Sequence, residues 1–498
     1  MLNPAEVLSP ITPEAAGVPS GAVQKFFKRL ADKQVSLHSV LMIRHGRLFA
    51  EGYYAPFTKD SKHRMYSISK SFVSAAIGCM IDEGRISLTD HIADLFPEYT
   101  AGKQLHPYMR QATIRDLLMM ADPHATGTYD SNTLDWVGSY FDTPPSHLPG
   151  QIFHYNTAAT VVLCALVEKL SGMPYLEYLR KPLLDPIGFS KDAYCIKTCC
   201  GRSWGGSGVI CTSRDLAKFA LVFLNGGRWG EQQLISADYV KAATSKQIST
   251  VSTEQDVEMC QGYGYKFWRT RHNGFACRGM GSQLAICLPD QDFLLVTTAD
   301  AQALNPNDTL IYDALWEEIL PYLNSGKENL PEDPAALAAL EKDLSALSLL
   351  TVPGSYSSPV AEKVSGKVYN VNLTDGEGQI SKVSFTFTQE GGTLAYTNKT
   401  GNHTLSFGYG HQVEQSFPEL HYFGKQIGIP SGKGYRTFGS CAWQDDNTLF
   451  LRFFLADEYF GTLKMTIRFD GDTITFLNTK TAEWFLNDYL AYASGHAE

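Results

Sequence analysis

The chain has 498 residues, of which 44% are hydrophobic and 19% are charged, and this composition excludes a disordered or fibrous protein. Lysine and arginine total 42 against 52 aspartates and glutamates, which gives a formal net charge of −10. Nucleic acids and anionic membranes bind basic surfaces, so the charge balance argues against both as partners.

The N-terminal segment and the cysteines indicate a cytoplasmic protein. The first residues lack the basic region and apolar core of a signal peptide, and no apolar run reaches the roughly 20 residues of a membrane span. The cysteines include a cluster, Cys195, Cys199 and Cys200, but no second Cys/His pair stands at zinc spacing. We therefore expect reduced thiols, no membrane contact and no metal, and no pattern in the sequence sets an oligomeric state.

The first part of the chain contains one clear hairpin pattern and two clear helix patterns. The segment HSVLMIRHGRLFAEGYY is expected to form a hairpin with His45 and Gly46 near the turn. Residues 70–84 carry apolar side chains at helical spacing, and Gly84 is the expected C-cap. Ser213 is the expected N-cap of a second helix, over RDLAKFALVFLNGG.

The later part of the chain changes from a mixed pattern to strands. Residues 274–300 predict two strands joined at Pro289-Asp290. Residues 326–350 form a charged, proline-marked linker that runs into an Ala/Leu helix. Within residues 351–498, apolar and polar positions alternate between Gly, Asn and Asp turns in KVYNVNL, KVSFTFTQ, TLAYTN, TLFLRFFL, TLKMTIRF and TITFLN. We predict an α+β unit over 1–325, a linker, and an antiparallel all-β module, either a barrel or a sandwich.

The motif that points most directly to chemistry is S-x-x-K, formed by Ser67 and Lys70 at the start of the apolar helix. Residues i and i+3 of a helix share a face, so this spacing sets a hydroxyl beside an amine. A serine hydroxyl becomes a nucleophile when a base removes its proton, and lysine serves as that base when burial lowers its pKa. The alternative is a serine N-cap followed by an exposed lysine, because the motif also occurs by chance in long chains.

Four segments around this motif occur in a recognisable order. They are HRMYSISKSFVSAAIGCMIDEGRISLTDHIADLFPEY, LPGQIFHYNTAATVVLCALVEKLSG, WGGSGVICTSRDLAKFALVFLNGGRW and RGMGSQLAICLPDQDFLLV. Together they resemble the serine β-lactamase and penicillin-binding-protein-like hydrolases over about residues 10–325. The resemblance implies an α/β sandwich of the transpeptidase type, in which an antiparallel sheet carries helical layers. It also implies an acyl-serine mechanism that needs no cofactor.

By this resemblance Ser67 is the nucleophile, Lys70 is its base and Tyr155 is a second acid/base group. Tyr155 follows the turn signal Pro149-Gly150 and precedes a long apolar helix, so it can project from a loop. A phenol between the lysine and the leaving group can relay a proton, provided that cationic neighbours lower its pKa.

Glycines near residue 280 allow the close backbone approach that an oxyanion hole requires. By the resemblance, the N–H groups of Ser67 and Met280 form this hole, with Gly281 one position away as the alternative donor. The residues beside these groups are expected to contact the substrate, and they are His154, Asn156, Arg278, Gly279 and Gly281.

Two departures from the family pattern narrow the expected substrate. The second motif of the family is usually Tyr-x-Asn or Ser-x-Asn, whereas Tyr155-Asn156-Thr157 places the asparagine one position early. The third motif usually begins Lys-Thr-Gly or His-x-Gly, whereas here Arg278 precedes Gly279, and this arginine either binds a substrate carboxylate or faces outward.

Both departures favour the esterase and 6-aminohexanoate-dimer hydrolase branch, which implies a small-molecule ester or linear amide, or a short peptide-like substrate. Two alternatives within the fold stay open. One is a β-lactamase or D-aminopeptidase-like penicillin-recognising enzyme, and the other is a binding protein that is acylated without turnover.

Two further motifs have simpler explanations. Gly201–Gly205 fits the G-x-S-x-G elbow of α/β-hydrolases with Ser203 as nucleophile, but more glycines follow and the next helix begins only near Ser213. Asp130-Ser131-Asn132 resembles a scrambled S-D-N motif, and loop capping explains it better. An α/β-hydrolase that uses Ser203 is the alternative outside the family.

Overall fold

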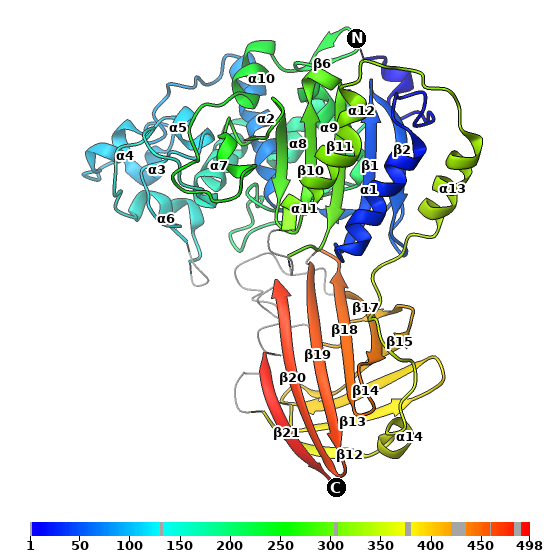
Figure 1. Ribbon diagram of the computed structural model, residues 1–498. Helices are drawn as coiled ribbons and strands as arrows, with labels where there is room; N and C mark the ends of the chain where they lie inside the picture. Colours follow the sequence, from blue (N-terminus) through cyan, green and yellow to red (C-terminus); the bar gives the residue numbers. More distant parts are fainter. Residues whose placement is uncertain are drawn as a thin grey trace. The chain divides into compact units, whose positions relative to one another are not determined.

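The computed structural model describes residues 2–129, 133–302, 307–373, 380–419, 435–458, 460–482 and 490–498. The chain divides into two compact units, Met1–Ser348 and a second unit that begins at Leu349. Each unit has a large sheet of its own (Figure 1). Across the described ranges no single helix is long and apolar enough to cross a bilayer. The two helical segments Thr157–Ser171 and Tyr175–Leu184, which meet at a bend of 67°, reach that length and apolarity only when they are counted together.

A six-stranded antiparallel sheet forms the frame of the first unit. Its strands, in spatial order, are β2 (Arg47–Tyr53), β1 (Leu37–Arg44), β11 (Phe293–Ala299), β10 (Gln283–Leu288), β9 (Phe275–Gly279) and β8 (Trp268–Arg269). β1 and β2 form the expected hairpin, and both turn residues, His45 and Gly46, have positive φ, as a tight two-residue turn requires. β1 also pairs with β11, so the N-terminal hairpin joins the sheet next to a strand from the end of the unit.

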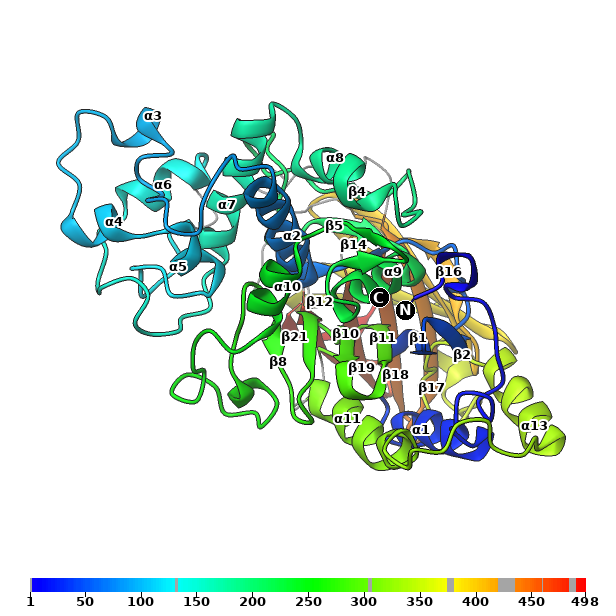
Figure 2. The same ribbon diagram turned by 90° about the horizontal axis from the view of Figure 1, so that it is seen from above.

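Helices cover both faces of this sheet (Figure 2). On one face, apolar strand residues pack in a single core with α1 (Ser20–Asp32), α11 (Asn307–Ala314), η6 (Leu315–Ile319) and α12 (Leu320–Leu323). On the other face α9 (Ser213–Leu224) contacts β1, β10 and β11. Strand residues alternate between the two faces, and both faces are covered, so β1, β10 and β11 are buried along their whole length.

The rest of the first unit is largely helical and centres on α2 (Ser69–Asp82) and α7 (Thr157–Ser171). These two helices pack on each other and on α8 (Tyr175–Leu179), and α7 also contacts α5 (Ile114–Leu118) and α6 (Trp136–Asp142). The remaining elements of the unit are η1 (Pro4–Glu6), β3 (His63–Arg64), η2 (Tyr66–Ile68), α3 (Pro97–Thr100), α4 (Pro107–Gln111), η3 (Arg180–Leu184), β4 (Tyr194–Cys195), β5 (Val209–Cys211), β6 (Arg228–Trp229), β7 (Gln232–Gln233), α10 (Ala237–Thr244), η4 (Met259–Gln261), η5 (Pro289–Gln291) and α13 (Pro334–Ser345).

The second unit is an antiparallel sheet that closes on itself. Its strands, in spatial order, are β15 (Gly401–Tyr409), β14 (Gly391–Asn398), β13 (Lys382–Phe387), β12 (Val368–Leu373), β21 (Ala491–Ala497), β20 (Thr473–Ala482), β19 (Phe460–Asp470), β18 (Thr448–Ala456), β17 (Arg436–Trp443) and β16 (Val413–Ser416), preceded in the chain by α14 (Ala361–Val364). A short parallel pairing of β15 with β17 closes the ring and gives a barrel-like module.

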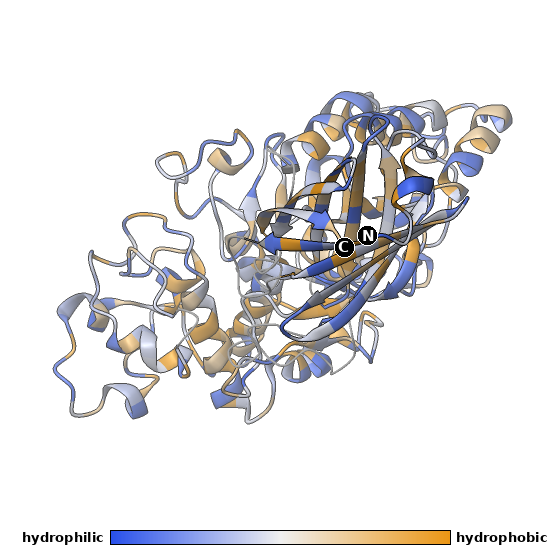
Figure 3. Ribbon diagram, turned by 90° about the horizontal axis from the view of Figure 1, so that it is seen from below, coloured by the Kyte–Doolittle hydropathy of each residue, from blue (hydrophilic) through white to orange (hydrophobic). Residues whose placement is uncertain are grey.

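Hydrophobic and hydrophilic positions alternate along several strands of this module (Figure 3). The inward side carries aromatic residues that contact one another, and they include Tyr369, Phe385, Phe387, Trp443 and Phe469. The Trp443 indole N–H donates to the Tyr409 hydroxyl at 2.9 Å, so the polar atom of the largest core side chain is paired.

The predicted fold class, a transpeptidase-type α+β unit followed by an all-β antiparallel module, is confirmed, and three local details differ. Thr212 rather than Ser213 caps α9, because its hydroxyl accepts the N–H of Asp215 at 3.1 Å. Residues 274–300 form three strands rather than two, since Gly281 and Ser282 adopt positive φ and reverse the chain between β9 and β10. The helix expected in the linker is α13, and it belongs to the first unit, where it packs on α1 and β2.

Candidate active site

Ser67 and Lys70 lie at the junction of η2 and α2, with their side chains in contact. Lys70 Nζ donates to Ser67 Oγ at 2.9 Å and to the carbonyl oxygen of Gly206 at 2.6 Å. The lysine is 1% exposed, and this burial lowers the pKa of its amine to about 7. A large fraction of Lys70 is therefore neutral at pH 7, as a base for the serine hydroxyl needs to be.

The turn that carries Ser67 has an unusual backbone. Tyr66 has φ of 46°, in the left-handed region that side-chain-bearing residues rarely adopt. The Arg64 guanidinium packs over the Tyr66 ring at 4.4 Å and over the Trp204 ring at 4.7 Å. Arg64 Nε also donates to the carbonyl oxygen of Ser207 at 3.0 Å. The arginine thus ties this turn to the segment whose carbonyl accepts from the lysine.

Tyr155 precedes α7 and lies beside Lys70, whose Nζ is 5.1 Å from the centre of the phenol ring. The ring stacks against Trp268 at 5.7 Å with an interplanar angle of 20°. Burial raises the pKa of Tyr155 to about 12, while a hydrogen bond with Ser67 and the charge of Arg278 act in the opposite direction. The proton relay expected from the sequence required cationic neighbours to lower this pKa, but burial outweighs their effect, so the phenol is protonated at neutral pH.

Tyr155 packs against a small buried cluster. Its members are Met120, Phe153, Tyr263 and Trp268, with Ile248 and Met259 also packed against it. Because these side chains are bulky and apolar, they hold the phenol ring in place and exclude water from one of its faces.

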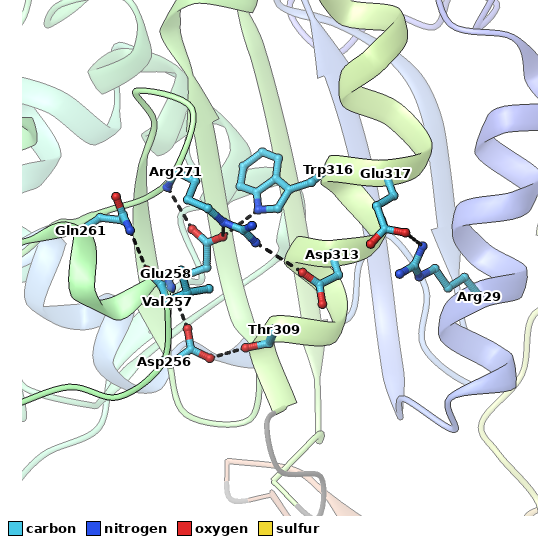
Figure 4. A network of polar contacts seen from close by, with 10 residues as sticks. All are labelled: Arg29, Asp256, Val257, Glu258, Gln261, Arg271, Thr309, Asp313, Trp316 and Glu317. Atoms are coloured by element: carbon cyan, nitrogen blue, oxygen red, sulfur yellow. Dashed lines mark hydrogen bonds and ion pairs between the residues drawn. The ribbon is translucent and has the colours of Figure 1, made fainter.

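A network of polar contacts anchors the segment that precedes Tyr263 (Figure 4). The buried Glu258 accepts hydrogen bonds from Arg271 Nε at 2.5 Å and from Trp316 Nε1 at 2.7 Å. Asp256 accepts from the hydroxyl of Thr309 on α11. The segment is therefore fixed to α11 and η6 on the sheet side of the unit.

The end of β9 lies against the backbone of Ser67. A Cβ at Gly279 would lie 2.3 Å from the carbonyl oxygen of Met65 and 3.3 Å from the amide nitrogen of Ser67, so a side chain there would collide with the backbone. The next residue, Met280, is 46% exposed at the start of the turn. The Gln283 amide donates to the Met280 carbonyl at 2.9 Å and holds that turn.

Arg278, at the end of β9, is held by α11. Its Nε donates to Asp308, whose other carboxylate oxygen accepts from the Ser282 hydroxyl at 2.6 Å. The guanidinium also lies 5.9 Å from the centre of the Trp268 ring, and the side chain is 28% exposed. The positive charge is thus balanced inside the protein.

Asn156 and His154 flank Tyr155 in the chain. Asn156 caps α7, since its Oδ1 accepts the N–H of Ala158 at 3.0 Å, and its Nδ2 donates to Asp122 at 3.0 Å. Both polar ends of this buried amide are therefore engaged within the protein. His154 is half-buried, and its backbone N–H donates to the carbonyl of Met120 at 2.8 Å.

The other candidate motifs lie elsewhere or have structural roles. Ser203 is buried among turns and its N–H donates to Glu168, and the next element is the strand β5, so the strand–turn–helix elbow of an α/β-hydrolase is not formed there. Asp130-Ser131-Asn132 lies outside the described residues. Among the residues that are described, no three His, Cys, Asp or Glu side chains group closely enough to hold a metal ion.

The sequence did not identify four residues that complete this site, namely Gly206, Trp268, Gln283 and Asp308. The glycine run around Gly206 was an available signal, because consecutive glycines indicate close backbone packing. Gln283 is a fully buried amide at the start of an otherwise apolar strand, which also could have been noticed. Trp268 and Asp308 contact residues that are distant in the chain, and a single sequence does not show which distant residues come together.

A family model and a curated relative each match more than half of the chain. The β-lactamase family model matches residues 23–318. The 6-aminohexanoate-dimer hydrolase of Paenarthrobacter ureafaciens is 25% identical over 303 residues, which cover 56% of this chain and 77% of that relative.

Two solved structures share the fold over 61% of this chain. EstCE1, a hydrolase with promiscuous acyltransferase activity, aligns with a TM-score of 0.50 at 16% identity, covering 61% of this chain and 99% of its own. A β-lactamase candidate from Bacteroides dorei DSM 17855 aligns with a TM-score of 0.51 at 17% identity, covering 61% and 98%. With a family match over more than half of its length, the chain belongs to the β-lactamase family.

Proposed function

We propose that the protein is a serine hydrolase that cleaves an ester or amide bond of a small molecule or short peptide-like substrate through an acyl-Ser67 intermediate. The observation that carries this proposal is the contact of 2.9 Å between Ser67 Oγ and the buried amine of Lys70. A pKa of about 7 gives that amine the basicity and the neutral fraction that a general base needs near pH 7.

In the acylation step, the neutral amine of Lys70 takes the proton of the Ser67 hydroxyl while Oγ attacks the substrate carbonyl. The negative charge on the carbonyl oxygen is stabilised by the N–H groups of Ser67 and Met280. Tyr155 then gives its phenolic proton to the leaving alcohol or amine as the carbonyl–heteroatom bond breaks. The protonated Lys70 beside the ring stabilises the phenolate that forms.

In the deacylation step, the Tyr155 phenolate takes a proton from water, and the hydroxide attacks the acyl carbon. The bond between the acyl carbon and Ser67 Oγ breaks, and Lys70 returns its proton to the serine. Each group ends in its starting protonation state, so the cycle consumes only the substrate and one water molecule and needs no cofactor.

Two observations support the proposed substrate class, namely the names of the related proteins and the pairing of Arg278. The relative from Paenarthrobacter ureafaciens is named for the hydrolysis of a linear amide, and EstCE1 is named as a hydrolase with acyltransferase activity. In addition, Arg278 stands where the family usually has Lys or His, and its charge is balanced by Asp308. Because the guanidinium is already paired with Asp308, it is less available to the carboxylate beside a β-lactam ring, and this supports esters and linear amides as the substrates.

The proposal is tested by labelling the purified protein with a fluorophosphonate and mapping the modified peptide. We expect the label on Ser67, and we expect Ser67→Ala to lose both labelling and hydrolysis of p-nitrophenyl esters. Ser203→Ala is the matched control, because it removes a buried serine hydroxyl of the same unit, and it should keep both. A label on Ser203, or hydrolysis by Ser67→Ala, would overturn the proposal.

A substrate panel separates the alternatives within the family. It contains short acyl esters, linear amides, D-amino-acid amides and a chromogenic cephalosporin. Turnover of esters or linear amides supports the proposed class, whereas preferred turnover of the cephalosporin or of the D-amino-acid amides indicates a penicillin-recognising enzyme. Stoichiometric labelling of Ser67 without release of product from any substrate would identify an acylated binding protein instead.

A further inference from the structure

A short strip of chain, Leu117–Asp122, runs behind the candidate active site and is bound to the segment that carries Tyr155. The carbonyl of Ala121 accepts the N–H of Gly150 at 2.7 Å, and the carbonyl of Met120 accepts the N–H of His154 at 2.8 Å. The strip therefore holds the Tyr155 segment through its backbone on the N-terminal side of the tyrosine.

Asp122 holds the same segment on the other side of the tyrosine. Its Oδ2 accepts from Asn156 Nδ2 at 3.0 Å and lies 3.1 Å from His124 Nδ1, and the carboxylate is fully buried. Asn156 in turn caps α7. The residues immediately before and after Tyr155 are thus both attached to the strip, one through its backbone and one through the Asp122 side chain.

Lys266 attaches the strip to α2, the helix that carries Lys70. Its Nζ donates to the carbonyl of Leu117 at 2.6 Å and contacts Met120 Sδ at 3.1 Å, while its carbonyl accepts from the Ser71 hydroxyl at 2.7 Å. Lys266 is 2% exposed and has φ of 65°, so both its side chain and its backbone are held in place. Ser71 directly follows Lys70 in the chain.

Lys266 and Asp122 are both buried ionisable groups. Burial lowers the pKa of Lys266 well below its usual value, the charge of Lys70 acts in the same direction, and the charge of Asp122 acts in the opposite direction. The second carboxylate oxygen of Asp122 has no hydrogen-bond partner among the described residues. Apolar residues of similar volume are often as stable as buried ionisable groups, so stability alone does not account for this pair, whereas a role in holding a geometry does.

We propose that Asp122 and Lys266 are positioning residues that fix Tyr155 relative to Lys70 by binding the Tyr155 segment and α2 to one strip of chain. This inference rests on the proposed function, since it assigns these residues a task in the same site. Asp122 and Lys266 act through their neighbours. Their hydrogen bonds to other described residues reach the Tyr155 segment and α2, and not the side chains of Ser67 or Tyr155.

The test compares Lys266→Met, Asp122→Leu and Asp122→Asn in steady-state hydrolysis of a p-nitrophenyl ester. Lys266→Met keeps the volume and removes the amine, and we expect kcat to fall at least tenfold with KM within twofold. Asp122→Leu should behave in the same way. Asp122→Asn keeps an oxygen that can accept from Asn156, so its kcat should lie between those of the wild type and Asp122→Leu.

The matched control is Glu14→Gln. Glu14 is also a buried carboxylate, 4% exposed, that accepts two hydrogen bonds from Ser20, at 2.7 and 3.0 Å, in the N-terminal segment. The Glu14→Gln variant should have a lower thermal midpoint of unfolding and an unchanged kcat. The proposal is overturned if Lys266→Met and Asp122→Leu keep kcat within twofold of the wild type. It is also overturned if Glu14→Gln loses as much kcat as these variants at an equal loss of stability.

Labelling of Ser67 in the wild type separates this inference from the proposed function. If the fluorophosphonate fails to label wild-type Ser67, the proposed function has failed. If the wild type is labelled and turns over while the variants remain as active, only the positioning roles have failed.

Discussion

The amine of Lys70 donates to the carbonyl oxygen of Gly206 at 2.6 Å, so its second hydrogen-bond partner is a neutral backbone group. Within the described part of the chain, Lys70 forms no ion pair. A carboxylate in the place of that carbonyl would favour the charged amine and raise its pKa. Burial therefore dominates, and the pKa of Lys70 falls to about 7.

The first prediction concerns the pH dependence of hydrolysis. Because the neutral amine is the active form, kcat/KM should rise with pH through about 7 and fall about tenfold per pH unit on the acid side. Tyr155, with a pKa of about 12, should cause no decline below pH 10. The profile is measured with an ester whose spontaneous hydrolysis is slow, and a flat profile between pH 5 and 9 would contradict the role of Lys70.

The second prediction concerns Gly279. Its Cβ position lies 2.3 Å from the Met65 carbonyl, so Gly279→Ala must push β9 away from the Ser67 backbone. We expect kcat/KM to fall about a hundredfold, because displacements near 1 Å cost that much in an aligned site. Gly21→Ala is the control, since a Cβ there meets no atom within 4 Å, and it should leave the rate unchanged. Equal rates for the two variants would show that β9 does not contribute to the reaction.

The third prediction concerns the ion pair between Arg278 and Asp308. Asp308→Asn leaves a partly buried guanidinium without its counter-charge, so we expect the free energy of unfolding to fall by about 2 kcal/mol in urea titrations. Asp32→Asn breaks the exposed ion pair with Lys28 and should change the free energy of unfolding by less than about 0.5 kcal/mol. A double-mutant cycle with Arg278→Met that shows no coupling would exclude a stabilising pair.

The fourth prediction concerns acid stability. His38 Nδ1 lies 2.8 Å from His63 Nε2 in the interior, and burial lowers the pKa of His63 to about 3. Burial and the charge of His63 lower the pKa of His38 well below its usual value. The unfolded chain therefore binds more protons than the folded one below about pH 6.5, so stability should fall as the pH drops from 6.5 towards 3.

For His63 alone the slope should reach about 1.4 kcal/mol per pH unit. The measurement is the free energy of unfolding at pH 7, 6 and 5, for the wild type and for His63→Gln. The variant should show a shallower slope, and His45→Gln, at a half-exposed histidine, serves as the control. Parallel slopes for the wild type and His63→Gln would contradict this account.

The sequence predicted six strands of the second unit, at segments in which apolar and polar residues alternate. β12, β13, β14, β18, β19 and β20 all contain segments with this pattern. β17 was not predicted, because its residues are buried on both faces and the alternation disappears. β21, with the sequence AYASGHA, is composed mainly of small residues that carry little hydrophobic signal.

In the candidate site, the sequence predicted the groups that lie on one local element. Ser67 and Lys70 are three residues apart on one helical face, and their contact follows from helix geometry. The partners that come from elsewhere in the chain were not predictable in this way. Gly206 and Asp308 reach the site through sheet topology and loop path, and although the glycine run around Gly206 indicates close packing, neither position shows by its spacing that it lies beside Ser67 or Arg278.

The left-handed conformation of Tyr66 has a consequence for how the protein loses activity. A residue with a side chain costs on the order of 1 kcal/mol in this region, so the turn before Ser67 is held by contacts such as that with Arg64 and not by its own preference. When denaturant loosens those contacts, this turn relaxes towards an ordinary backbone before the sheet opens. Inactivation should therefore precede unfolding, and enzymatic activity should be lost at a lower urea concentration than the secondary structure.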